Sequence, residues 1–309
     1  MLALIFPGQG SQSLGMLKAL SEQFPQVLQR FQEASDIIGK DLWTIVQENP
    51  DDQLNHTIYT QPILLTASYA AYEVLQQELA ISPQFLVGHS LGEYSALTVA
   101  GALPFAEAVA LVHQRGSIMQ EAVPFGEGAM AAILGLEDKV VREVCSGIEG
   151  GEVYPANYNS PGQVVIGGKK AAVDAAIVAA KAAGAKRAVL LPVSVPSHTP
   201  LMRSAAAKFS LFLDQIHWQE PKISVIFNVD AKQHKDRYGI QAALGAQLYE
   251  PVLWTDCITA LGEAGVNKVI EVGPGKVLSG LAKRIDNRIS ADNFDSPDQL
   301  EGLRSFLEQ

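Results

Sequence analysis

The chain has 309 residues with 48% hydrophobic and 18% charged side chains, which is enough for one large domain or for a large and a small one. Its formal net charge of -10 at pH 7 argues against a general affinity for nucleic acid or for anionic membranes. No apolar stretch approaches the roughly 20 residues of a bilayer span, and no secretory signal is recognisable. Two distant cysteines, Cys145 and Cys257, predict a reduced chain without a metal site. These features predict a soluble, cytoplasmic protein.

The first hundred residues alternate strands and helices. Residues 2–6 predict a strand, and residues 61–79 predict a long amphipathic helix with Pro62 in its first turn. A short buried strand at 85–87 then leads into a helix at 91–100. This order is typical of an α/β domain.

The sequence GHSLG at 88–92 lies where that short strand ends and the next helix begins. A serine held out at a sharp strand-to-helix turn has strained dihedral angles, and flanking glycines remove the Cβ clashes that would forbid close packing. The segment therefore predicts a nucleophile elbow with Ser90 as the nucleophile. The five-residue pattern alone is weak, because chance produces it about 0.1 times in a chain of this length. A tight structural turn is the alternative.

Residues 125–195 form a separate pattern. Strand and helix signals follow in the order β-α-β-β-α-β, which predicts a small ferredoxin-like domain. We expect this domain to be inserted into a larger α/β domain made of residues 1–124 and 196–309. The predicted segments are 126–136, 137–147, 152–158, 163–168, 169–185 and 186–192, with a turn at 159–162.

The larger domain resumes with a helix at 199–213, for which Thr199 is the expected cap. A strand at 222–228, helices at 241–250 and 252–265 and a strand at 267–272 follow. The last twenty residues are loosely helical and carry no clear signal.

A serine hydroxyl is a poor nucleophile until a base takes its proton, so Ser90 requires a histidine. Among six histidines, His198 stands in a loop between a strand and a helix, where active-site groups tend to lie. A local hydrogen-bonding role is the alternative for it. His89 is adjacent to Ser90 and is expected to point elsewhere.

Arg115 shares the apolar face of its predicted helix with Leu111 and Val112. A guanidinium is costly there unless it meets an anion, which predicts a clamp on a substrate carboxylate. An arginine that interacts with the negative end of the helix dipole, at the C-terminus of the helix, is the alternative.

Gln9 follows the first strand between two glycines, so its N–H could form an oxyanion hole with that of Leu91. A dinucleotide fingerprint fails here, since the third glycine, Gly15, comes two positions late. The segment EVGPGKVL at 271–278 could approach a phosphate or form a plain strand-to-helix turn.

Seven motifs follow one another over almost the whole chain: FPGQGSQ, GHSLGEYSAL, QRG with MQEA, NSPGQVVIGG, VPSHTPLM, QLYEPVLWT and EVGPGKVLSGL. Together they resemble the malonyl-CoA:acyl carrier protein transacylase family of type II fatty acid synthesis. The resemblance implies a hydrolase-like α/β large domain with a ferredoxin-like insertion. It also implies a ping-pong cycle in which Ser90 takes malonyl from malonyl-CoA and passes it to holo acyl carrier protein. Coenzyme A enters as the substrate thioester, and no cofactor is bound permanently.

The resemblance assigns further roles by matched position. His198 acts as base and then as acid, oriented by the main-chain carbonyl of Gln247 rather than by an aspartate. Gln9 and Leu91 supply the oxyanion N–H groups.

Arg115 holds the free carboxylate of malonyl in the same assignment, which would discriminate against acetyl. Three further residues match positions that line the acyl pocket: Met119, Gln163 and Ser197.

The carrier protein and coenzyme A are both anionic, so we expect docking at a basic cluster, with a merely solvated helix face as the alternative. A monomer is the expected state. The two clusters are Lys283, Arg284 and Arg288, and Lys181, Lys186 and Arg187.

Three other functions remain open at this level. A free-standing acyltransferase could feed a polyketide synthase, and a serine thioesterase or esterase could use water as acceptor with the same groups. A non-catalytic carrier-binding scaffold is the third, against which the intact Ser90 and His198 argue.

Overall fold

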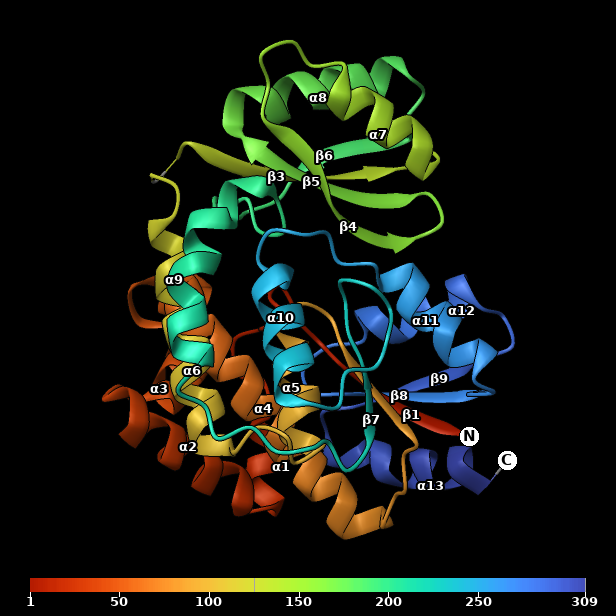
Figure 1. Cartoon of the computed structure of the whole chain (residues 1–309). Coiled ribbons are helices and arrows are strands. Elements are labelled where there is room, and N and C mark those ends of the chain that lie inside the picture. Colours follow the sequence, from red (N-terminus) through yellow and green to blue (C-terminus); the bar gives the residue numbers. More distant parts are fainter. Residues whose placement is uncertain (125, 309) are drawn as a thin grey trace.

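A computed structural model describes residues 1–124 and 126–308 (Figure 1). Its larger part is built on a five-stranded sheet in the order β7-β2-β1-β8-β9, in which every neighbouring pair is parallel. Strands of this kind are covered on both faces, which explains why the first strand is buried along its whole length. The strands are β1 (Leu2–Phe6), β2 (Phe85–Gly88), β7 (Ser224–Ile226), β8 (Lys268–Val272) and β9 (Ser290–Phe294).

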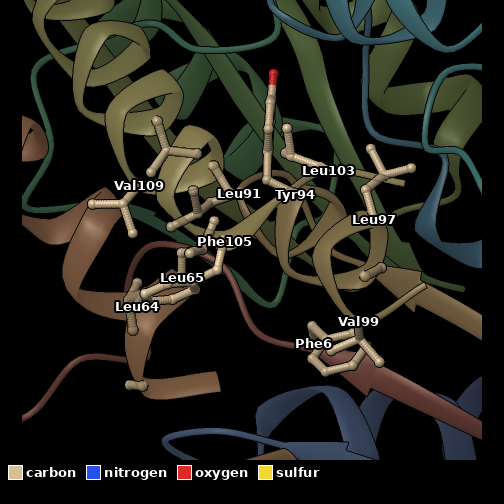
Figure 2. Packing of buried hydrophobic residues seen from close by; sticks show 14 of the residues in the cluster. Phe6, Leu64, Leu65, Leu91, Tyr94, Leu97, Val99, Leu103, Phe105 and Val109 are labelled. Carbon is tan, nitrogen blue, oxygen red and sulfur yellow. The ribbon is translucent and has the colours of Figure 1, made fainter. Parts of the chain in front are cut away.

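Alternate residues of β1 divide the core into two layers. Leu4 and Phe6 belong to a large apolar cluster on one face, whereas Ala3 and Ile5 belong to a smaller cluster on the other. Figure 2 shows part of the large cluster, with Phe6 and Tyr94 among its labelled side chains.

The helices of the larger part lie, in chain order, between the strands of its sheet or after the last of them. They are α1 (Lys18–Gln23), α2 (Gln26–Ile38), α3 (Leu42–Glu48), η1 (Pro50–Asn55), α4 (Thr57–Leu79), α5 (Gly92–Val99), α6 (Phe105–Glu121), η2 (Pro200–Met202), α9 (Arg203–Leu213), α10 (Arg237–Gln247), α11 (Trp254–Glu263), α12 (Val277–Ile285), η3 (Pro297–Gln299) and α13 (Leu300–Glu308).

The second part is a four-stranded antiparallel sheet in the order β4-β5-β3-β6. Two helices pack on one face of this sheet through a separate apolar cluster, and the other face is turned toward the larger part (Figure 1). Its elements are β3 (Gly128–Leu134), α7 (Asp138–Ser146), β4 (Val153–Ser160), β5 (Gln163–Lys169), α8 (Lys170–Ala182) and β6 (Arg187–Leu190). The element order and approximate ranges predicted from the sequence match these.

Main-chain hydrogen bonds join the two parts. The N–H of Tyr158 on β4 donates to the Val252 carbonyl at 2.9 Å, and the Val252 N–H donates to the Ala156 carbonyl at 2.9 Å. The strand β6 ends at Leu190, and the chain then passes back to the larger part. The predicted boundary at Phe125 lies outside the described residues.

Several predicted element ends shift by a few residues, and four differences have a clear physical reason. The helix expected to begin at residue 61 begins at Thr57, because the Thr60 hydroxyl and N–H bind the His56 carbonyl and add a turn before Pro62. The turn predicted at 159–162 is shorter, since β4 continues to Ser160. Thr199 does not cap a helix with its side chain; its hydroxyl donates to the Pro196 carbonyl before a short 3-10 turn.

The fourth difference is β9, an edge strand inside the stretch where only loose helix was expected. Only Ala291 and Phe294 of its five residues are buried, so its apolar signal is weak. Within residues 1–124 and 126–308, no helix has the length and apolar character needed to cross a membrane.

Candidate active site

The turn between β2 and α5 carries Ser90 in a left-handed backbone conformation, with φ of +53°. Such a conformation is uncommon for a residue with a side chain and persists where its surroundings fix it. A Cβ at Gly88 would overlap the Gly92 backbone, and one at Gly92 would overlap the Phe6 carbonyl. Both glycines of the motif are therefore required by the close approach of α5 to the strand ends.

His198 lies against Ser90 although 108 residues separate them in the chain. Ser90 Oγ and His198 Nε2 are 2.7 Å apart, and His198 Nδ1 is 2.6 Å from the Gln247 carbonyl oxygen. Because a carbonyl only accepts, Nδ1 carries the ring hydrogen and Nε2 has the free lone pair. Ser90 therefore donates to His198, which is the polarity needed in a nucleophile and base pair.

The His198 loop is fixed by its own backbone. His198 has φ of +62°, and its N–H donates to the Leu248 carbonyl at 2.9 Å. The side chain is 3% exposed. Burial and, second, the nearby charge of Arg115 lower the pKa of His198 to about 3, so the ring is neutral at neutral pH.

Arg115 on α6 is a buried guanidinium, 1% exposed. Its Nη1 donates to Gln61 Oε1 at 2.8 Å and its Nη2 donates to Gln247 Oε1 at 2.9 Å. Nη2 is also 3.4 Å from Ser90 Oγ. Among the described residues, Arg115 forms no ion pair and its Nε has no hydrogen-bond partner. The cation beside the serine is therefore held by neutral amides and can receive an anion.

Gln247, at the end of α10, contacts all three of these residues. Its carbonyl orients His198, its Oε1 accepts from Arg115, and its Nε2 donates to the Ser90 carbonyl at 3.0 Å. The prediction gave Gln247 a main-chain role only, and its side-chain hydrogen bonds to Arg115 and to the Ser90 carbonyl were not predicted.

Gln9 and Leu91 follow the adjacent parallel strands β1 and β2, so their backbones lie at the same edge of the sheet. The Ser90 N–H donates to Asn228, whereas in residues 1–124 and 126–308 no acceptor binds the N–H of either Gln9 or Leu91. Both N–H groups are therefore free to donate, and their role as an oxyanion hole stays a prediction.

The predicted acyl-pocket residues fall at different distances from this cluster. Met119 is buried on α6, where its sulfur accepts from Gln61 Nε2 at 3.8 Å. Ser197 adjoins His198, but its hydroxyl is directed to the Val195 carbonyl. Gln163 accepts from Arg284 on α12 at 3.0 Å and has no hydrogen bond to the Ser90 cluster in the described part of the chain. His89 points away, toward Asn159 and Trp254, as predicted.

Sequence reasoning missed three buried polar residues that support the cluster: Gln61, Glu93 and Asn228. Gln61 binds Arg115, Asn228 binds the Ser90 turn, and Glu93 accepts from the backbone N–H of Asn228. Asn228 comes two residues after the carboxyl end of the strand β7, which is a position where site residues of α/β sheets gather.

A cavity of about 410 Å³ lies between the end of β3, the turn at 161–162 and α12. Lys186 and Arg284 line it, one from each of the two predicted basic clusters. The glycine turn after β8 has another role: Gly273 packs on Ser68, and the Gly275 N–H donates to Asp295 at 3.1 Å. These contacts fit a strand-to-helix turn.

Residues 3–289 match the family described as the acyl transferase domain. The malonyl CoA-acyl carrier protein transacylase of Escherichia coli K12 is 51% identical over 299 residues, which cover 96% of this chain and 97% of the relative. The corresponding structure from Coxiella burnetii superposes with a TM-score of 0.97 at 45% identity, covering 100% of this chain and 98% of the other. A malonyl-transacylase solved with its holo type II polyketide acyl-carrier protein gives a TM-score of 0.97 at 49% identity and 99% coverage of both chains.

These matches extend over both sheets and over the Ser90 turn together. The chain therefore belongs to the acyl transferase domain family and, within it, to the malonyl CoA-acyl carrier protein transacylases.

Proposed function

We propose that this acyltransferase moves a malonyl group from malonyl-CoA to the phosphopantetheine thiol of holo acyl carrier protein through a malonyl ester on Ser90. One observation carries the proposal. The same Ser90 Oγ lies 2.7 Å from the histidine that accepts its proton and 3.4 Å from a buried guanidinium. A nucleophile, a base and a carboxylate receptor are thus concentrated at one point.

In the first half of the cycle, Ser90 Oγ attacks the thioester carbonyl as its proton passes to His198 Nε2. The carbonyl oxygen becomes an oxyanion that the N–H groups of Gln9 and Leu91 stabilise. The carbon–sulfur bond then breaks, and the coenzyme A thiolate leaves with the proton from His198. In the second half, the carrier thiol attacks the ester by the same steps and restores Ser90.

Arg115 binds the free carboxylate of the malonyl group in this scheme. The carboxylate also neutralises the charge that helps to lower the pKa of His198. Bound malonyl therefore makes His198 a stronger base, whereas an acetyl group leaves the guanidinium unpaired. Met119, Gln163 and Ser197 are proposed to shape the rest of the acyl site.

We also propose that residues 125–195 are a ferredoxin-like domain inserted into a hydrolase-like domain made of 1–124 and 196–309. The strand order β4-β5-β3-β6 supports the first assignment, and the elbow at the end of β2 supports the second. A second cavity, of about 390 Å³, contains His198 and is lined by residues of both parts, and it is the proposed entry for the phosphopantetheine arm. A monomer without a permanent cofactor and a cytoplasmic location stay predictions.

A carrier of fatty acid synthesis is the proposed acceptor, and a polyketide carrier is the second candidate. The similarity to a transacylase that was solved with a polyketide carrier favours keeping this second candidate. A thioesterase that uses water is less favoured, because a buried cation beside the nucleophile suits few uncharged ester substrates.

Intact mass measurement tests the proposal. Malonyl-CoA should add one malonyl group to the wild type and none to Ser90→Ala, and holo carrier protein should then remove it as malonyl-carrier. Fatty acid and polyketide carriers tested side by side identify the acceptor. If the adduct drains to free malonate equally fast with and without carrier, the protein is a hydrolase and the transfer proposal is wrong.

A further inference from the structure

One buried amide holds the turn that carries Ser90. Asn228 follows β7, the strand beside β2, and its side chain has no exposed surface. Its Oδ1 accepts the Ser90 N–H at 2.7 Å, and its Nδ2 donates to the Gly88 carbonyl at 2.7 Å. The amide therefore binds the peptide groups on both sides of His89, where the chain changes direction.

Asn228 is in turn fixed by α5. Its backbone N–H donates to Glu93 Oε2 at 2.6 Å, and Glu93 is buried three residues beyond Ser90. Burial raises the pKa of Glu93 to about 8. The end of β7, the Ser90 turn and the first turn of α5 are thereby tied into one unit.

This unit matters because Ser90 has a left-handed backbone that its neighbours must maintain. Reacting groups that move by about 1 Å lose roughly 100-fold in rate, so the direction of Ser90 Oγ depends on the peptide groups that Asn228 binds. The same hydrogen bond occupies the Ser90 N–H, so this group is not available to an oxyanion.

We propose that Asn228 is a positioning residue for the acyl transfer: by binding the Ser90 N–H and the Gly88 carbonyl, it holds Ser90 Oγ in line with His198. The inference rests on the proposed function, in which Ser90 is the nucleophile. Asn228 contacts no reacting atom, so its loss should lower the rate of acylation and leave the KM for malonyl-CoA nearly unchanged.

Two substitutions separate positioning from packing. Asn228→Ala removes both hydrogen bonds. Asn228→Asp keeps the acceptor for the Ser90 N–H, but it can donate to the Gly88 carbonyl only when its carboxyl group is protonated. Glu93 on α5, Arg115 on α6, Asp230 beyond β7 and Cys257 on α11 surround the site, and burial with two neighbouring carboxyl groups should raise the pKa of the new acid.

The experiment measures single-turnover malonylation by rapid quench and intact mass, together with melting temperature, at about pH 6 and about pH 8.5. Leu303→Ala is the matched control, because it removes a buried side chain on α13 and lowers stability without touching the Ser90 turn. We expect Asn228→Ala to acylate about 100-fold more slowly than Leu303→Ala. The rate of Asn228→Asp relative to wild type should rise several-fold toward pH 6.

Three results are informative. If Asn228→Ala acylates within about threefold of Leu303→Ala at a similar melting temperature, Asn228 only packs and the inference is wrong. If Asn228→Ala does not fold, a rate ratio for Asn228→Asp that is independent of pH overturns the inference instead. If the wild type itself forms no malonyl adduct, the proposed function fails, which is a distinct outcome.

Discussion

Arg115 is a buried cation whose hydrogen-bond partners are neutral amides. Gln61 and Gln247 fix two of its nitrogens but leave its charge uncompensated, so an anionic substrate gains an ionic contact that a neutral one lacks. We therefore expect substrate selectivity at this site to depend on Arg115 and on the two glutamines that hold it.

Arg115→Ala should lower kcat/KM for malonyl-CoA by roughly 100-fold or more, since two charged hydrogen bonds contribute about 3 to 6 kcal/mol. The value for acetyl-CoA should change much less. Steady-state rates with both substrates measure this ratio. Equal kcat/KM for malonyl and acetyl in the wild type would contradict the role of Arg115.

The pKa of His198 predicts an unusual pH profile. A folded pKa of about 3 lies below the ordinary 6.5, so the histidine stays neutral as the pH falls through 6.5 and becomes protonated only near 3. We expect kcat/KM for acylation to remain constant down to about pH 5. Rates measured between pH 4 and pH 8, with melting temperature followed in parallel, would show it. A decline centred near pH 6.5 would mean that the free enzyme has an ordinary histidine.

At the scale of elements, the site depends on how closely α5 approaches the ends of β1 and β2. Gly88 and Gly92 permit this approach because any Cβ there would overlap backbone atoms. The turn is thus determined by packing between elements as much as by its own dihedral angles.

Gly88→Ala should destabilise the protein by about 1 to 3 kcal/mol or more, because backbone cannot move aside as a flexible side chain does. Gly302→Ala on α13 is the control, since open space surrounds that position and alanine favours a helix. Denaturant unfolding of both variants tests this. The explanation fails if the two glycines tolerate alanine equally.

Short-range sequence signals predicted the helices and strands well, but they did not predict contacts between residues that are distant in the chain. The GHSLG turn and the loop of His198 were recognisable because glycines and loop position carry information at short range. The edge strand β9 was missed because only two of its residues are buried. Asn228 and Gln61 were missed because each lies far along the chain from its partner, and only the fold brings the amides to Ser90 and Arg115.

At the scale of the whole molecule, the overall charge of -10 hides a local basic region. Lys186 from the antiparallel part and Arg284 from the parallel part line one cavity, so one residue of each predicted cluster lies at the same place. An acidic carrier protein would meet this region at the junction of both parts.

Charge reversal tests this docking surface. Arg284→Glu combined with Lys186→Glu should raise the KM for holo carrier protein at least tenfold, and the effect should shrink as salt is added. Lys208→Glu serves as the control, because it makes the same charge change at one site. It lies on α9, on the opposite side of the molecule from α12 in Figure 1. An unchanged carrier KM in the double variant would dismiss this surface.

The two main-chain hydrogen bonds between β4 and Val252 also limit how the two parts can move relative to each other. Closure around a substrate requires a hinge whose two sides rotate freely. Here β4 continues from these hydrogen bonds to Asn159. The Asn159 side chain lies 2.8 Å from Nε2 of His89, the residue next to Ser90. Separating the two parts would break these two hydrogen bonds and displace Asn159, which contacts the residue next to Ser90. We therefore expect the two parts to keep their relative positions while the flexible phosphopantetheine arm of the carrier enters the site.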